Sequence, residues 1–144
     1  MKVLLLTENW AQVGGIRNYL QSIAKYFPAG GVEVIEPSQW RFFWPIIRPQ
    51  WLPLFIKLYR KVKRAKASSE PYEVLCCGKA LFEGFVGYYL KKYLWLPYVV
   101  FTYAMEIDTW MAARGTRRKL ARVIKGADRI VYINNRTKQQ LLAM

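Results

Sequence analysis

The residues of this chain that could carry acid–base chemistry are carboxylates, because the 144-residue sequence contains no histidine. Serine–histidine and cysteine–histidine nucleophile systems are therefore excluded, and the adjacent thiols Cys76 and Cys77 are too few for a zinc site. Glu106 and Asp108 follow a predicted strand, which makes them the acids best placed to contact a hydroxylated substrate. A helix-capping Asp108 beside a solvated Glu106 explains the same residues equally well. Glu8 is a further loop acid with the same two interpretations.

A glycine pair in the first loop is a candidate for contact with a phosphate. The loop begins at Thr7 and ends in Gly14-Gly15, at the start of a predicted helix. Unpaired N–H groups and the helix dipole favour an anion at such a position. An ordinary tight turn is the simpler explanation of a single Gly-Gly pair. The loop has neither the GxGxxG pattern of a dinucleotide site nor the Gly-Lys-Ser/Thr of a phosphate-binding loop.

Aromatic and basic residues gather in an insertion and helix at about 38–67, and they predict contact with an anionic membrane surface. Indole side chains favour the interface between headgroups and hydrocarbon, and each basic residue near an anionic surface contributes about 1 kcal/mol. An ordinary amphipathic helix with a solvated basic face is the alternative. The side chains expected to contact the membrane are Trp44, Trp51, Lys57, Arg60, Lys61 and Arg64.

These residues must be positioned by strands and helices that alternate along the chain. Strands are expected at residues 3–6, 32–35, 72–77, 98–103 and 130–133. Helices are expected at residues 16–27, 54–67, 79–94, 114–125 and from 134 onward. This alternation predicts an α/β protein: a Rossmann-like, three-layer αβα sandwich with a parallel sheet, formed by residues 1–144 as a single domain. The loops expected to carry function are 7–15, 104–110 and 133–135.

Composition narrows the partners and the cellular location. The chain has 23 Lys and Arg residues against 9 Asp and Glu, so its charge of +14 favours nucleic acid, anionic lipid or a phosphorylated substrate. A 53% hydrophobic fraction argues against disorder. The apolar run after Lys2 ends at Thr7, which is too short for a secretory signal. The apolar segments 42–56 and 93–105 are interrupted by prolines or too short to span a membrane. We therefore expect a cytoplasmic protein.

Three segments in order resemble a known enzyme family. The first joins Lys2-Val3-Leu4-Leu5-Leu6 to Gly14-Gly15-Ile16, and the second joins Leu96-Pro97-Tyr98-Val99-Val100 to Tyr103-Ala104-Met105-Glu106. The third joins Ala127-Asp128-Arg129-Ile130-Val131 to Asn134, Thr137 and Leu141. Together they resemble the amino-terminal domain of family 4 glycosyltransferases, a retaining class with the two-domain GT-B fold. The resemblance covers nearly the whole chain and implies one half of that fold.

The resemblance implies an acceptor-side domain of an enzyme that transfers a sugar from a nucleotide-sugar donor to a glycan or lipid-linked acceptor. It places the enzyme in cell-envelope polysaccharide or glycolipid synthesis, peripheral at the inner face of the membrane. The donor pocket of the family lies in a carboxyl-terminal domain, which we expect to be missing from this chain. A missing domain or a separate donor-binding subunit is therefore an expected partner, the chain alone is expected to be inactive, and no cofactor or metal is expected.

The resemblance also implies site residues. The substrate-binding residues that it implies are Asn9, Gly14, Gly15, Arg17, Tyr103, Glu106 and Asn134. The chain departs from the family twice: Tyr103-Ala104 stand where His-Gly is usual, and Asn134 stands where serine is common. The missing imidazole leaves the sugar contact to the Tyr103 hydroxyl. Tyr103 and Glu106 are therefore the candidate catalytic residues.

Two other functions remain open at this stage. A noncatalytic nucleic-acid-binding or partner-binding module would use the +14 charge and aromatic stacking. The chain has no recognisable RNA or DNA motif, and its basic residues cluster on helices, so no specific nucleic acid is expected. Half of a nucleotide-cofactor oxidoreductase is disfavoured by the missing glycine fingerprint, with Glu33 and Glu36 as the nearest acids after the glycines.

Overall fold

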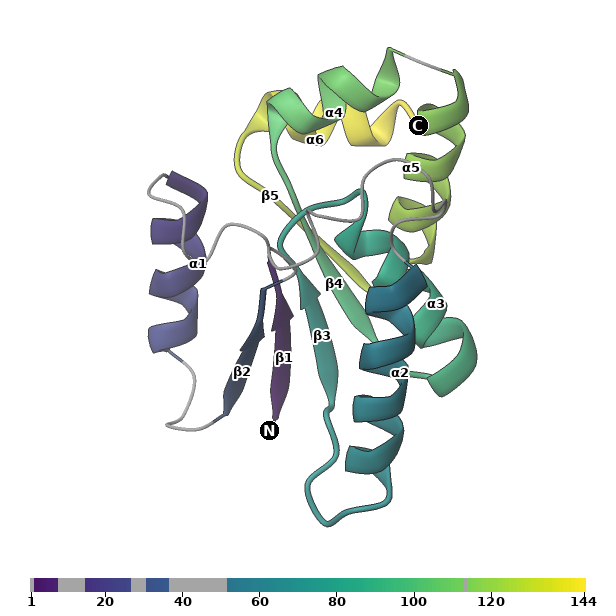
Figure 1. Ribbon diagram of the computed structural model, residues 1–144. Coiled ribbons are helices and arrows are strands. Elements are labelled where there is room, and N and C mark those ends of the chain that lie inside the picture. Colours follow the sequence, from purple (N-terminus) through teal and green to yellow (C-terminus); the bar gives the residue numbers. More distant parts are fainter. Residues whose placement is uncertain (1, 8–14, 27–30, 37–51, 113) are drawn as a thin grey trace.

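Five strands alternate with helices in a computed structural model that describes residues 2–7, 15–26, 31–36, 52–112 and 114–144 (Figure 1). In chain order the elements are β1 (Val3–Leu6), α1 (Gly15–Lys25), β2 (Val32–Ile35), α2 (Leu52–Lys66), β3 (Val74–Cys77), α3 (Glu83–Leu94), β4 (Tyr98–Thr102), α4 (Ala104–Met111), α5 (Arg114–Gly126), β5 (Arg129–Tyr132) and α6 (Asn135–Leu142).

The strands form one sheet in the order β2-β1-β3-β4-β5. Each neighbouring pair is parallel, with Leu5 of β1 aligned with Val34 of β2 and with Cys76 of β3. Parallel strands need crossover connections, and the helices between the strands provide them. The predicted Rossmann-like α/β class with a parallel sheet is therefore confirmed.

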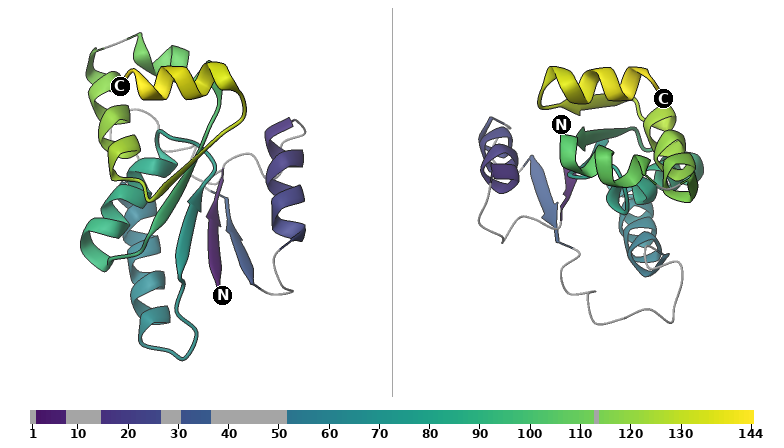
Figure 2. Two further views of the ribbon diagram at one scale, coloured as in Figure 1. Left: turned by 180° about the vertical axis from the view of Figure 1, so that it is seen from behind. Right: turned by 90° about the horizontal axis from the view of Figure 1, so that it is seen from above.

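Helices cover the two faces of the sheet unequally (Figures 1 and 2). α1 lies alone on one face, whereas α2, α3 and α5 lie on the other. Side chains of a strand alternate between faces, so Leu4 and Leu6 join the large core under α2, α3 and α5. Leu5 joins a smaller cluster with Leu20 and Phe101 on the α1 face. α4 and α6 lie beyond the carboxyl ends of β4 and β5.

α3 packs closely because it contains glycines where a side chain would collide. A Cβ at Gly84 would lie 2.5 Å from Val123 Cγ1 of α5, and a Cβ at Gly87 would lie 2.8 Å from Cys77 Sγ of β3. These contacts leave no room for even one methyl group. The two glycines therefore bring the α3 backbone against both the neighbouring helix and the sheet.

Two expectations about the chain are corrected. Residues 104–110 were expected as a loop, but α4 occupies them, because Ile107 is buried and Trp110 and Met111 pack against the core on the same helix face. A helix was expected from residue 79, but α3 begins at Glu83 and residues 78–82 form a loop. The other predicted elements are present, with ends that differ by at most two residues.

Candidate functional site at the carboxyl edge of the sheet

The strand order creates a switch point between β1 and β3. The chain leaves β1 toward α1 on one face and leaves β3 toward α3 on the other (Figure 1). In open α/β sheets, ligands bind outside the carboxyl ends of the strands at such a point. Thr7 follows β1, Gly78 follows β3 and Tyr103 follows β4, so these positions mark the candidate site.

Gly78 allows the loop after β3 to lie directly against β1 and α3. A Cβ at this position would be 2.8 Å from both Cβ and Oγ1 of Thr7 and 3.1 Å from Oε2 of Glu83. The N–H of Gly78 donates to the carbonyl of Leu6 at 2.8 Å. Glu83 is fully buried, and its Oε2 accepts from the N–H of Lys79 at 2.6 Å. Glu83 therefore holds the loop in place.

A tight turn at Phe82 ends this loop. Phe82 has φ 61° and ψ −70°, and the N–H of Glu83 donates to the carbonyl of Leu81 at 2.8 Å. This is the γ-turn with positive φ, which is rare and strained in a residue other than glycine. Such strain persists where surrounding contacts enforce it, and it occurs often at functional sites.

Glu106 closes the loop from the other side. It is the third residue of α4, and its Oε1 accepts from the N–H groups of Ala80 at 2.9 Å and Leu81 at 3.2 Å. Burial raises the pKa of Glu106 to about 7, although the N–H groups of Leu81 and Ala80, the charge of Lys79 and the N–H of Tyr103 all favour the ionised form. Glu106 therefore changes its charge near neutral pH.

The second oxygen of Glu106 and the hydroxyl of Tyr103 are further polar atoms of the site. Glu106 Oε2 and the Tyr103 hydroxyl oxygen are buried, and neither has a hydrogen-bond partner within the described residues. Tyr103 is only 8% exposed. Its burial, together with the negative charges of Glu83 and Glu106, raises its pKa, so the hydroxyl stays protonated. The site thus holds a neutral hydrogen-bond donor, the Tyr103 hydroxyl, and an acceptor, Glu106 Oε2, that could both bind a ligand.

α1 packs near Tyr103, on the face of the sheet opposite to α2, α3 and α5. Leu20 packs in one cluster with Tyr103, and the ring of Tyr19 meets Phe101 edge-on at 6.0 Å. Arg17, in the first turn of α1, has a buried Nε without a partner in the described part of the chain. Gly15 is the first residue of α1.

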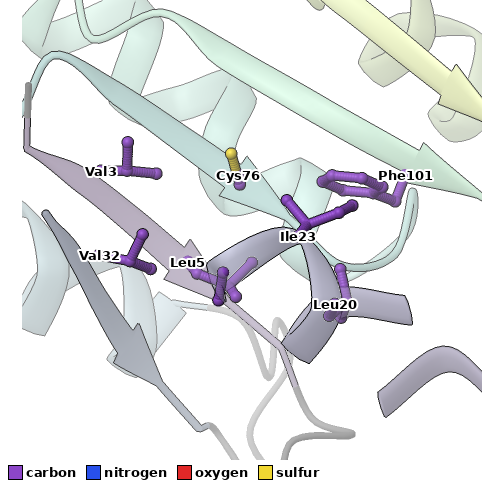
Figure 3. A pocket seen from close by; sticks show the side chains of 8 residues that line it. Val3, Leu5, Leu20, Ile23, Val32, Cys76 and Phe101 are labelled. Carbon is purple, nitrogen blue, oxygen red and sulfur yellow. The ribbon is translucent and has the colours of Figure 1, made fainter. Parts of the chain in front are cut away.

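A small apolar pocket lies between α1 and the sheet (Figure 3). Its volume of about 10 Å³ holds no more than a water molecule. Its wall includes Leu5, Leu20, Ile23 and Phe101 and carries no polar side chain. The pocket is therefore a packing defect under α1, separate from the polar atoms of the candidate site.

Other residues expected at the site have different environments. Asn134 is exposed and caps α6, because its Oδ1 accepts from the N–H of Thr137 at 2.9 Å. Asp108 does not cap a helix: it pairs with Arg136 at 2.9 Å and accepts from Gln140, which ties α4 to α6. Asn9 and Gly14 lie outside the described residues.

The sequence analysis missed Gly78, Lys79 and Glu83. A helix was expected to begin directly after β3, so no loop was expected there to carry function. The available signal was a glycine immediately after a buried apolar strand, a position where backbones often approach closely.

The residues expected to contact the membrane differ in their environments. Lys57, Arg60 and Arg64 are exposed on α2, whereas Lys61 points toward β2 and pairs with Glu33 at 2.5 Å. Trp44 and Trp51 fall outside the residues that the structure describes. Among the described residues, no helix is long and apolar enough to cross a bilayer, and no group of acids and thiols could hold a metal ion.

Comparisons with models of protein families, with curated proteins and with solved structures gave no significant match.

Proposed function

We propose that this chain is the acceptor-side half of a retaining glycosyltransferase with a GT-B architecture. The observation that carries the proposal is a pair of buried polar atoms at the carboxyl edge, Glu106 Oε2 and the Tyr103 hydroxyl, which have no hydrogen-bond partner among the described residues. Both residues lie in the segment that resembles the sugar-contacting loop of family 4 glycosyltransferases. They also lie beside the switch point where α/β sheets bind ligands.

The chemistry of this pair suits a sugar hydroxyl. The Tyr103 hydroxyl donates a hydrogen bond, and Glu106 Oε2 accepts one. When an acceptor hydroxyl attacks the anomeric carbon, the bond from that carbon to the nucleoside diphosphate breaks and the hydroxyl loses its proton. Glu106, with a pKa of about 7, takes up that proton. The donor would be held mainly by a second domain, from the same or another polypeptide, facing the amino terminus of α1.

Acceptor binding by the chain tests the proposal without any donor domain. Backbone amide NMR spectra would be recorded while neutral oligosaccharides and polyprenyl-linked sugars are added. We expect shift changes at residues 79–81 and 103–106, with binding weakened at least tenfold in Tyr103→Phe and Glu106→Gln, because each variant removes one hydrogen bond to the ligand.

Asp108→Asn is the matched control, because it neutralises an exposed acid on the same helix outside the site. It should bind the acceptors as the unmodified chain does. Shift changes confined to other surfaces would contradict the proposal. Tight, salt-sensitive retention of single-stranded RNA in filter binding, without acceptor binding, would favour the nucleic-acid-binding alternative.

A further inference from the structure

We propose that the outer surface of α2 and α3 docks onto an anionic lipid bilayer, a partner that does not depend on the proposed enzymatic activity. We call this the α2–α3 surface and define it by six exposed side chains: Ile56, Arg60, Lys63, Lys92, Tyr93 and Trp95.

Apolar side chains at the centre of this surface face solvent. Trp95 is 84% exposed, Tyr93 is 55% exposed and Ile56 is 42% exposed. They come from two helices that touch, since the ring of Phe55 in α2 lies 6.0 Å from that of Tyr93 in α3. These exposed apolar groups therefore lie on, or directly after, two helices that are in contact, and we call them the apolar patch.

Helical spacing places the basic residues beside this patch. Leu54, Leu58 and Val62 are the buried residues of α2, so Ile56, Arg60 and Lys63 share the outward face, separated by four and three positions. Lys92 lies over the ring of Tyr93, with 5.7 Å between its Nζ and the ring centroid. Cations therefore border the apolar patch from both helices.

Negative charge is missing from this surface. α2 contains no Asp or Glu, and the one acid of α3, Glu83, is fully buried at the helix start. Lys61 and Lys91 form ion pairs with Glu33 and Asp128 at the flanks. Within the described residues, the outward face consequently combines apolar groups with the positive charges of Arg60, Lys63 and Lys92, and this combination complements anionic headgroups above hydrocarbon.

The side chains fit a bilayer better than a nucleic acid. Tyr93 stacks on Tyr89 at an interplanar angle of 13° and also meets Phe55, so part of its ring is covered by protein and less of it is open to stacking with a base. Ile56 adds an aliphatic group, which phosphate recognition does not need. Trp95 presents an amphipathic indole, the side chain most characteristic of membrane interfaces.

Docking on this surface would orient the protein relative to the bilayer. α2 and α3 lie along the strands on one face of the sheet (Figures 1 and 2). A bilayer against them would lie parallel to the strands, so the carboxyl edge with Tyr103 and Glu106 would open along the membrane surface. If the proposed function holds, this placement favours an acceptor whose reacting sugar projects from a membrane lipid.

Vesicle flotation with matched variants tests the proposal. The probes are vesicles of phosphatidylglycerol and phosphatidylcholine, with pure phosphatidylcholine for comparison. Arg60→Glu/Lys63→Glu alters the α2–α3 surface, and Lys119→Glu/Arg122→Glu alters two exposed residues of α5 at the same spacing. Both change the net charge from +14 by the same four units. We expect about 30-fold weaker binding for the first variant and a much smaller effect for the second.

Ile56→Ser/Trp95→Asn tests the apolar contribution. Asparagine tolerates the left-handed backbone of Trp95, which has φ 55°, so the helix end should remain intact. We expect at least tenfold weaker binding to anionic vesicles, with unchanged circular dichroism. Equal losses in the α2 and α5 charge variants would overturn the proposal, as would an absence of vesicle binding. Binding to single-stranded RNA in place of vesicles would overturn it as well.

Discussion

The carboxyl group of Glu106 is subject to opposing influences. Three backbone N–H groups and the charge of Lys79 favour its ionised form, but burial outweighs them and raises its pKa from 4.5 to about 7. The desolvation cost of a charge is larger than the benefit of a few hydrogen bonds when one oxygen remains unpaired. Glu106 is thus the described residue best suited to exchange a proton at the carboxyl edge.

This shift predicts how stability depends on pH. The folded carboxyl binds its proton more tightly than the unfolded one, so Glu106 contributes stability below pH 4.5 that is lost as the pH rises through about 7. In Glu106→Gln this loss disappears. The free energy of unfolding of Glu106→Gln, relative to that of the wild type, should therefore rise by about 1 to 3 kcal/mol when the pH is raised from 5 to about 8.5.

Urea denaturation at both pH values would measure this gain. Asp108→Asn serves as the control, because it neutralises an exposed carboxylate on the same helix outside the site. A carboxyl ¹³C titration of Glu106 with a midpoint near 4.5 would show that the side chain is solvated, and the assignment of Glu106 as a proton-exchanging group would then fail.

At the scale of elements, α3 is held by close backbone packing. Gly87→Ala would force a methyl group to within 2.8 Å of Cys77 Sγ and of Cδ2 of the Tyr98 ring, and both neighbours belong to buried residues that cannot move away. We expect a loss of about 1 to 3 kcal/mol in the free energy of unfolding. Chemical denaturation followed by circular dichroism would measure it.

Gly115→Ala is the matched comparison. Gly115 lies in α5, and an added Cβ would meet no atom within 4 Å. The same substitution should therefore stabilise the protein by about 0.5 to 1 kcal/mol, because alanine loses less conformational freedom in a helix. Equal effects of the two alanine substitutions would contradict the close packing of α3.

α4 is a helix that the local sequence pattern did not predict. Among its residues with described side chains, Ile107 is the fully buried apolar one, so the hydrophobic periodicity is too short to separate a helix from a loop. The helix forms where Glu106 can reach back to the N–H of Tyr103, in the manner of a capping box. Packing of Trp110 and Met111 against the core then stabilises it.

For the molecule as a whole, the charge of +14 is a source of self-repulsion. Salt screens this repulsion, so raising NaCl from about 20 mM to about 200 mM should raise the Tm. Thermal unfolding followed by circular dichroism would measure the increase. Lys119→Glu/Arg122→Glu lowers the net charge and should show a smaller increase. A Tm that does not respond to salt would mean that the cations are too far apart to matter.

Much of the architecture is determined by the sequence alone. Continuous apolar runs such as Val3–Leu6, bounded by polar and turn residues, indicate a strand buried on both faces. Helical spacing of apolar residues between such strands then implies parallel pairing and a three-layer arrangement. These features are local, so residues close together in the chain suffice to predict them. The position after a predicted strand directed attention to Glu106, and the family resemblance added Tyr103.

The tertiary structure alone decided how the site is assembled. Glu106 meets the N–H groups of Ala80 and Leu81, which lie 26 and 25 positions away in the chain. It also decided that Lys61 pairs with Glu33 and that Asn134 caps a helix. Whether a carboxylate is solvated, paired or buried depends on neighbours from distant segments, and folding alone brings those neighbours together.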